Sequence, residues 1–422
     1  MSQLKLIQYL RAVEALRNGV ANADAVRVLG CNQPLVVGPF DQQMADCQAG
    51  VATGKQAPGQ LVMGGFGAGK SHLLEYLEQR ALAQQFVCSR VVISKETPLY
   101  DTTKVFCAAT ETAQVPGVTG QAIQELALRL TPGNSAFEEF SRWANQSRAG
   151  ISPIFPASLR LHESLRGDTE LVEQITDFWA GERLAASKVK QGLAKIGGQG
   201  WYDVKSVKKA QLAGERIAFM SRLILGAGFT GWAVLIDEVE LIVRYGLQQR
   251  GRAYAELARW LGRIKSVQYP GLVVVAAITD DFSAAVIEKD GKNDLDRVPE
   301  AFQRKGTDEA LAVATWAESG MRTIRRDAVA LEPPSDDHLQ DTYKLLKGVH
   351  AAAYKWSPPN IPAAERQARR AMRSHVRRWI NEWDLKRLYP GSAVTTEELH
   401  IGPTYEEDTE IGKFEGEDDE ED

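Results

Sequence analysis

The sequence lacks the features that mark secreted and membrane proteins. No apolar run approaches the roughly 18 residues that a membrane-spanning helix needs, and the amphipathic pattern of residues 1–19 does not resemble a signal peptide. Cysteine is also scarce, and no two cysteines have the C-x-x-C spacing of a metal or redox site. We therefore expect a cytoplasmic protein with no membrane contact, no zinc site and no disulfide framework. The four cysteines are expected to be small buried thiols: Cys31, Cys47, Cys88 and Cys107.

Acidic residues are concentrated at the C-terminal end. Residues 405–422 carry eleven carboxylates against the single Lys413, a net charge of −10, whereas the whole chain carries −5. The remaining residues are therefore mildly basic, with a net charge of +5. Like charges at this density repel one another and bury little surface, so we expect residues 396–422 to form a disordered tail. The tail either serves solubility or mimics nucleic acid and shields a basic groove.

Four short apolar stretches have the composition of buried strands in a parallel sheet. Segments with helical periodicity separate them, and the clearest of these places Leu73, Leu77 and Ala81 on one face. The pattern predicts an α/β fold. The expected strands are Leu61–Met63, Arg90–Ser94, Trp232–Ile236 and Leu272–Ile278.

A glycine-rich motif follows the first expected strand. Residues 64–71 read GGFGAGKS and fit the pattern G-x-x-x-x-G-K-[ST], between an apolar strand and an amphipathic helix. Glycines let successive backbone N–H groups point inward and form an anion cradle at the positive end of the helix. In this P-loop, or Walker A motif, Lys70 would contact the β- and γ-phosphates of ATP, and the Ser71 hydroxyl would bind Mg²⁺. The expected nucleotide-binding residues are Gly64, Gly65, Phe66, Gly67, Ala68, Gly69, Lys70, Ser71 and His72.

Two carboxylates end the third expected strand. The sequence WAVLIDE places Asp237 and Glu238 directly after an apolar run, as in a Walker B motif. Asp237 would bind Mg²⁺, and Glu238 would orient and polarise the attacking water. The separate glutamate indicates an ATPase that hydrolyses ATP. By family-level inference, and not from the spacing alone, it suggests the ATPase division in which another strand lies between the two motif strands.

Further catalytic residues are expected after the fourth strand. Thr279 would sense the γ-phosphate and position water, although simple capping of the strand end explains it equally well. An arginine that reaches the nucleotide of a neighbouring subunit is also expected, and the sequence does not choose among the candidates. These are Arg297, Arg304, Arg322, Arg325 and Arg326.

The motifs and strand spacing predict an AAA+-like P-loop NTPase with additions. The second and third strands are much farther apart than a single crossover requires, which predicts a mostly helical insertion within residues 100–230. Another helical region follows Pro333–Pro334. The expected units are an N-terminal helical segment (1–55), an ATPase core (56–330), a C-terminal helical domain, either a lid or winged-helix-like (331–395), and the acidic tail (396–422).

Residues 366–387 are expected to form a basic helix. Met372, Val376, Trp379 and Trp383 form an apolar stripe. Arginines follow one another at helical spacing beside it, and such a ridge can lie along a DNA backbone. The ridge is alternatively a solvated face paired with acids, or it supplies a lid arginine that contacts ATP. The basic residues are Arg366, Arg369, Arg370, Arg373, Arg377, Arg378, Lys386 and Arg387.

The chain resembles the BREX-type ATP-binding proteins of the BrxD-like family, P-loop ATPases of bacterial phage-defence islands. The resemblance is most specific in AVEALRNGVANADAVRVLGCNQP, GGFGAGKSHLLEYLEQRAL, FVCSRVVISKETPL and VLIDEVELI. It implies an AAA+/origin-recognition-like α/β core with a helical lid, and homo-oligomeric assembly. It also implies action on DNA beside an Lhr-like helicase, with the roles given above for Lys70, Ser71, Asp237 and Glu238.

Three functional hypotheses follow. In the first, the protein is an antiphage ATPase whose nucleotide state controls assembly on DNA and recruitment of a helicase. In the second, it is a nucleotide-gated signalling switch that acts on a protein partner. In the third, it is a DNA-binding regulatory ATPase of transposition or replication.

Overall fold

The computed structural model describes residues 3–207, 209–361, 371–391 and 406–408. Most of the expected acidic tail and the first arginines of the expected basic helix, Arg366, Arg369 and Arg370, lie outside the described residues. Among the helices that are described, none combines the length and apolarity that crossing a bilayer requires.

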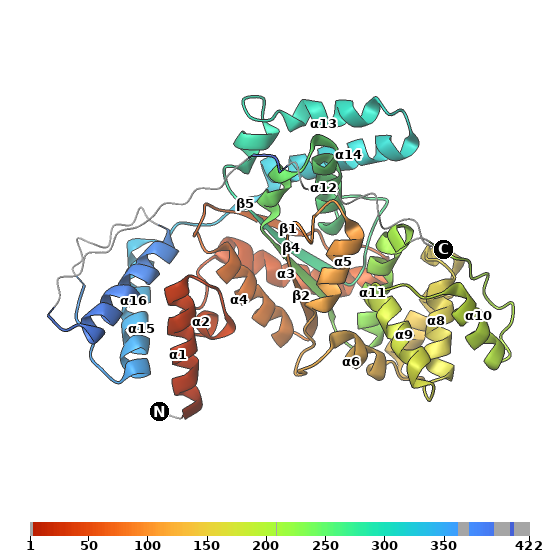
Figure 1. The fold of residues 1–422 in the computed structure, drawn as a ribbon, viewed down its shortest axis with the longest axis horizontal. Coiled ribbons are helices and arrows are strands. Elements are labelled where there is room, and N and C mark those ends of the chain that lie inside the picture. The colour runs from red at the N-terminus through yellow and green to blue at the C-terminus, as the bar shows by residue number, and fades with distance from the viewer. Residues whose placement is uncertain (1–2, 208, 362–370, 392–405, 409–422) are drawn as a thin grey trace.

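The centre of the molecule is a five-stranded parallel sheet with the order β2-β3-β4-β1-β5 (Figure 1). All four expected strands are present, and β4 has the expected bounds. β2 begins four residues earlier than expected, and β5, with only two residues, was not expected. The strands are β1 Gln60–Met63, β2 Phe86–Val92, β3 Gly231–Asp237, β4 Leu272–Ile278 and β5 Val329–Ala330.

The strand order brings the two sequence motifs to one edge of the sheet. β4 lies between β1, which leads into the glycine-rich loop, and β3, which ends at Asp237. Met63 pairs with Ile278, and Ile236 pairs with Ala276. Because all three strands are parallel, their carboxyl ends lie side by side. The expected intervening strand is therefore present.

Helices cover both faces of the sheet and create two cores (Figure 1). Alternate residues of each strand point to opposite faces, so Val234 belongs to one core and Leu235 to the other. On one face lie α3 Pro34–Thr53 and α4 Lys70–Ala83. On the other lie α5 Thr102–Glu111, α11 Ala213–Gly226 and α12 Leu247–Trp260.

The long connection between β2 and β3 contains helices. One isolated β-bridge joins Gln114 of this connection to Cys88 of β2. Its aromatic residues extend the second core: the rings of Phe155 and Trp179 lie 5.0 and 5.7 Å from that of Phe219 on α11. The helices between α5 and α11 are α6 Ala122–Arg129, α7 Ser135–Ala144, α8 Ile154–Ser164, α9 Thr169–Ala180 and α10 Ala186–Lys195, with 3₁₀ turns at Ser147–Ala149 and Lys209–Leu212.

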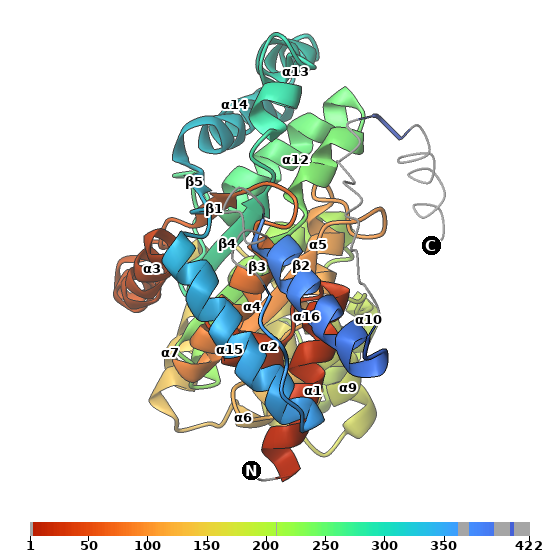
Figure 2. The same ribbon diagram turned by 90° about the vertical axis from the view of Figure 1, so that its left-hand side faces the viewer.

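The two ends of the described chain form a third core. α1 Gln3–Asn18 and α2 Ala23–Leu29 pack against α15 Asp336–Tyr354 and α16 Met372–Leu388 (Figures 1 and 2). Trp379 and Trp383 are buried in it, as the apolar stripe predicts. Arg17 forms an ion pair of 2.6 Å with Asp384. The first two helices therefore share a core with the last two, whereas α3 packs on the sheet.

A helical pair follows β4 and packs on α12. It comprises α13 Asp294–Gln303 and α14 Asp308–Arg322. Gly320 of α14 is buried where α14 crosses α12, and a Cβ at this position would collide with the carbonyl oxygen of Tyr254 on α12. Glycine is required here because it allows the backbones to approach.

We expect Gly320→Ala to destabilise the protein by about 1–3 kcal/mol, because the added methyl group forces α14 away from α12. Gly348→Ala is the matched control, since Gly348 lies exposed in α15 with nothing near its Cβ position. That change should stabilise by about 0.5–1 kcal/mol through helix propensity. Urea unfolding followed by tryptophan fluorescence measures both. Equal effects would contradict the close approach.

Candidate nucleotide-binding site

The loop between β1 and α4 curls around its own backbone N–H groups. Gly67 and Gly69 have φ angles of 79° and 104°, which residues other than glycine rarely adopt. Gly64 N–H donates to the Ile278 carbonyl at 3.2 Å and anchors the loop to β4. α4 begins at Lys70, so the positive end of its dipole faces the loop. The geometry suits an anionic group.

Lys70 is buried, with 8% of its surface exposed. Its ammonium donates to the Gly64 carbonyl at 2.8 Å and lies 3.7 Å from Glu240 Oε1. Burial raises the pKa of Glu240 to about 7, although the positive charge of Lys70 opposes the shift. Glu240 Oε2 is buried and has no hydrogen-bond partner among the described residues. Glu240 therefore competes with any incoming anion for Lys70.

Arg90 on β2 connects Asp237 to the start of α4. Its guanidinium donates to the Ser71 carbonyl at 3.0 Å, lies 3.6 Å from Asp237 Oδ2, and pairs with Glu75 at 2.7 Å. Asp237 itself is 4% exposed. Arg90 therefore compensates the buried Asp237 carboxylate and fixes it beside the turn that carries Ser71.

Glu238 begins a 3₁₀ helix, η3 Val239–Arg244, and adopts a left-handed backbone conformation with φ 61°. For a residue with a Cβ this conformation costs about 1–2 kcal/mol, and such strain is concentrated at functional sites. Its N–H donates to Asp237 Oδ1 at 3.1 Å. Burial raises the pKa of Glu238, and the neighbouring Asp237 carboxylate adds to the shift.

A cavity opens above the loop, between the sheet and the third core. Its floor is residues 65–73 with Glu238 and Glu240. Residues 19–21 and 29–33 form one wall of the cavity. Another wall consists of Leu331, Glu332, Pro334, His338 and Thr342, and α16 closes the cavity with Met372, Arg373 and Val376. His72 Nε2 contacts the Gly30 carbonyl at 2.8 Å and thereby fixes one wall to α4.

Arg373 extends from α16 into this cavity. Its guanidinium lies 5.4 Å from the centre of the Phe66 ring, and its side chain runs within 3.5 Å of the Cβ position of Gly67. Its positive charge opposes the raised pKa of Glu238. Arg373 Nε is buried without a hydrogen-bond partner among the described residues. A half-buried arginine next to the loop, with an unpaired buried Nε, is suited to an anion.

The other expected residues lie farther from the cavity. Among the described residues, Gly64, Asp237 and Thr279 do not line it, although Thr279 is 4% exposed at the end of β4, beside β1. None of the five candidate arginine fingers lines it either. Arg304 pairs with Glu300 at 3.2 Å, and Arg325 pairs with Glu288 at 2.7 Å.

The arginines in the described part of the basic helix lie in different environments. Arg373 faces the cavity. Arg378 pairs with Glu382 at 2.9 Å, and Arg387 lies 3.4 Å from Asp384. Arg377 is exposed. The ridge is therefore a less uniform surface than its spacing suggests.

Sequence reasoning did not identify Glu240, Arg90 or the wall at residues 19–33. Glu240 carried a signal, because DEVE places a third acid two residues after Glu238. The lid arginine was among the alternatives for residues 366–387, but the spacing alone did not single out Arg373. Arg90 and the wall depend on long-range packing and carry no local signal.

The chain was compared with models of known protein families. The model described as "BREX system ATP-binding protein BrxC/D" matches residues 10–126 and 162–383. The matched segments contain the loop, Arg90, the acids after β3, and Arg373. No curated protein and no solved structure gives a significant match.

We expect Glu240→Gln to raise the affinity for ATP on the order of tenfold at pH 8, because it removes the negative charge that competes with the phosphates for Lys70. Protonation neutralises the wild-type carboxyl as pH falls through its pKa of about 7, so the two affinities should converge at pH 6. Binding of a fluorescent ATP analogue to the two proteins at each pH gives the ratio of the two affinities. Protonation of the analogue itself affects both affinities equally and therefore cancels in the ratio. Glu309→Gln on the exposed face of α14, outside the cavity lining, is the control. A ratio independent of pH would contradict the competition.

Proposed function

The chain belongs to the family of BREX system ATP-binding proteins BrxC/D, and we propose that it is an ATPase that hydrolyses ATP within this phage-defence system. The observation that carries the proposal is the meeting of Lys70, Glu238 and Arg373 around one cavity. These side chains come from the loop, the end of β3 and α16, and together they can bind phosphates and activate water.

The residues present fit ATP with Mg²⁺. The left-handed Gly67 and Gly69 shape a backbone anion site, and Lys70 is held beside it. The Ser71 hydroxyl and the Asp237 carboxylate are hard oxygen ligands of the kind that Mg²⁺ prefers. Bound Mg²⁺ would neutralise charge that develops on the phosphates. The apolar side chains Val20, Leu331 and Met372 offer a surface for the base.

Glu238 is the proposed catalytic base. Its carboxylate would orient the attacking water and accept its proton, and a pKa raised towards neutrality suits a general base. Lys70 would stabilise charge on the β- and γ-phosphates. Thr279 at the end of β4 is proposed to position water from the neighbouring strand.

A helical lid is proposed to close the site. The strand order, with β4 between β1 and β3, and the helical cap formed with α15 and α16 support an AAA+-like P-loop NTPase. In such an arrangement Arg373 would contact the phosphates and report their presence to α16. Because α16 packs with α1 and α15, a movement of Arg373 would move the whole third core.

DNA, other copies of the chain and an Lhr-like helicase are the proposed partners. Exposed Arg377 on α16 supports contact with a DNA backbone. Among the candidate fingers, Arg297, Arg304, Arg322 and Arg326 are exposed, so a neighbouring subunit could reach them. We propose that nucleotide state controls assembly on DNA and recruitment of the helicase.

Glu238→Gln should reduce the rate of ATP hydrolysis by at least about 100-fold while ATP still binds, because the variant lacks the general base. Phosphate release is measured with and without double-stranded DNA, and Glu309→Gln on the exposed face of α14 is the control. Stimulation by DNA that disappears in Glu238→Gln would support DNA-coupled hydrolysis. Negligible wild-type turnover that DNA does not change would instead favour the nucleotide-gated switch.

Arg373→Ala should weaken ATP binding about tenfold or more, because a charge-assisted contact to phosphate is lost. The matched control is Arg377→Ala, one helical turn away on the exposed face of α16. It should leave ATP affinity unchanged and lower only the stimulation by DNA. Equal losses of ATP affinity in the two variants would refute the proposed lid contact.

A further inference from the structure

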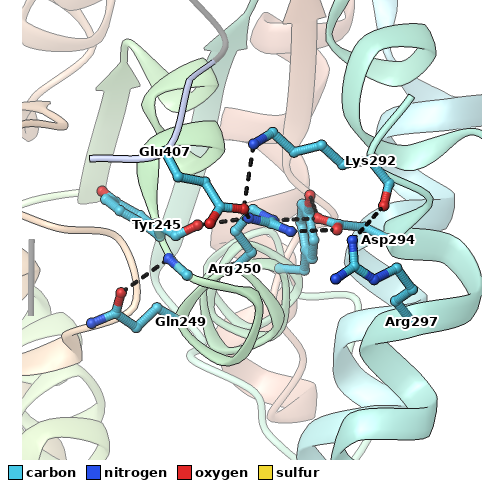
Figure 3. Close-up of polar contacts among 9 residues, drawn as sticks. Tyr245, Gln249, Arg250, Lys292, Asp294, Arg297 and Glu407 are labelled. Carbon is cyan, nitrogen blue, oxygen red and sulfur yellow. Dashed lines mark hydrogen bonds and ion pairs between the residues drawn. The ribbon is translucent and has the colours of Figure 1, made fainter. Parts of the chain in front are cut away.

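A short acidic segment near the C-terminal end lies against the ATPase core, far along the chain from its partners (Figure 3). Glu407 accepts a hydrogen bond from Arg250 at 2.5 Å, and its carboxylate lies 3.3 Å from the ammonium of Lys292. Asp408 pairs with Lys95 at 2.6 Å. Each of the two successive carboxylates therefore has its own cationic partners.

The arginine at the centre of this contact is held rigidly. Arg250 has no exposed surface. Asp294 accepts two hydrogen bonds from its guanidinium at 2.7 and 2.8 Å, and the Tyr245 carbonyl accepts a third at 2.7 Å. Asp294 is fixed in turn by the Tyr254 hydroxyl at 2.7 Å. The guanidinium is thus oriented by the core, independently of the acidic segment.

Positively charged side chains lie against both carboxylates of the segment. Asp294 balances the charge of Arg250, whereas Lys292 lies 3.3 Å from Glu407 and Lys95 lies 2.6 Å from Asp408. Figure 3 shows Arg297 next to Lys292, and its guanidinium donates to the Lys292 carbonyl at 3.2 Å. Burial alone would raise the pKa of Glu407, but the bonds and charges of Arg250 and Lys292 outweigh it and lower the pKa. The site therefore favours an ionised ligand.

We propose that Arg250, Lys292 and Lys95 form a binding site for acidic peptides, and that its ligand is this chain's own acidic C-terminal segment beginning at Glu407. A backbone contact favours a peptide over a nucleic-acid phosphate: the N–H of Asp408 donates to the Arg244 carbonyl at 2.9 Å. That carbonyl would repel a phosphate oxygen, whereas it pairs with an amide. The site does not depend on nucleotide hydrolysis.

The acidic-peptide site lies next to η3 and the end of β2 in the ATPase core. Arg244 is the last residue of η3, the 3₁₀ helix that Glu238 begins, and Lys95 follows β2. Docking therefore restrains η3 at the end opposite Glu238. Because the ligand belongs to the same chain, its effective concentration is high and the site is filled without a partner.

The test uses the full-length chain and a fluorescent peptide of residues 404–410, TYEEDTE. Glu407→Lys with Asp408→Lys empties the site by charge reversal. Anisotropy should show that the peptide binds this emptied chain at least about tenfold more tightly than wild type, whose own segment competes. Adding Lys95→Gln and Lys292→Gln to the emptied chain should weaken binding at least about fivefold. The more exposed Lys289→Gln is the matched control.

Several outcomes would overturn the proposal. The proposal fails if the emptied chain binds the peptide no better than wild type does, or if Lys95→Gln with Lys292→Gln leaves binding unchanged. It also fails if the neutral peptide TYQQNTQ binds equally well. A single-stranded oligonucleotide that binds the emptied chain through Lys95 and Lys292, with no binding of the acidic peptide, would assign the site to nucleic acid. Arg250 is left intact throughout, and thermal unfolding of each variant checks that the fold is retained.

Discussion

The parallel pairing of β1, β4 and β3 is the constraint on which the rest of the site depends. Parallel strands end at a common edge, so the loop after β1 and the acids after β3 meet although about 170 residues separate them. The buried charges of Lys70 and Asp237 then require partners, which Glu240 and Arg90 supply. Sheet order thus sets the position of each charge, and burial sets its partner.

The fold was predictable wherever the signal was local. The apolar run of β4 is bounded by Pro270–Gly271 and Thr279–Asp280, and its predicted bounds matched the structure. β2 begins earlier than predicted because the sequence marks no boundary within Phe86–Ser89. β5 has two residues and no detectable pattern. The loop at 64–71 and the Asp237–Glu238 pair were identifiable because their chemistry requires particular residues at fixed spacing. Their catalytic roles remain predictions.

What could not be predicted depends on contacts between distant segments. The apolar face of α1 fits a helix packed on the sheet as well as one packed on α16, and the structure has the second arrangement. Likewise, the spacing of Arg373 and Arg377 looks alike in the sequence, yet one faces the cavity and the other faces solvent. The division of labour along α16 follows from the direction in which its tryptophans are buried.

The packing of α1 against α16 also determines when the third core can form during protein synthesis. Arg17 and its partner Asp384 are 367 residues apart. At a ribosomal rate of about 5–20 residues per second, α1 waits on the order of tens of seconds for α16 to emerge. The sheet and its loop leave the ribosome earlier, so the core forms before its cap does. During that interval Ala12 and Val13, which are fully buried in the finished molecule, lack their final neighbours and expose apolar surface.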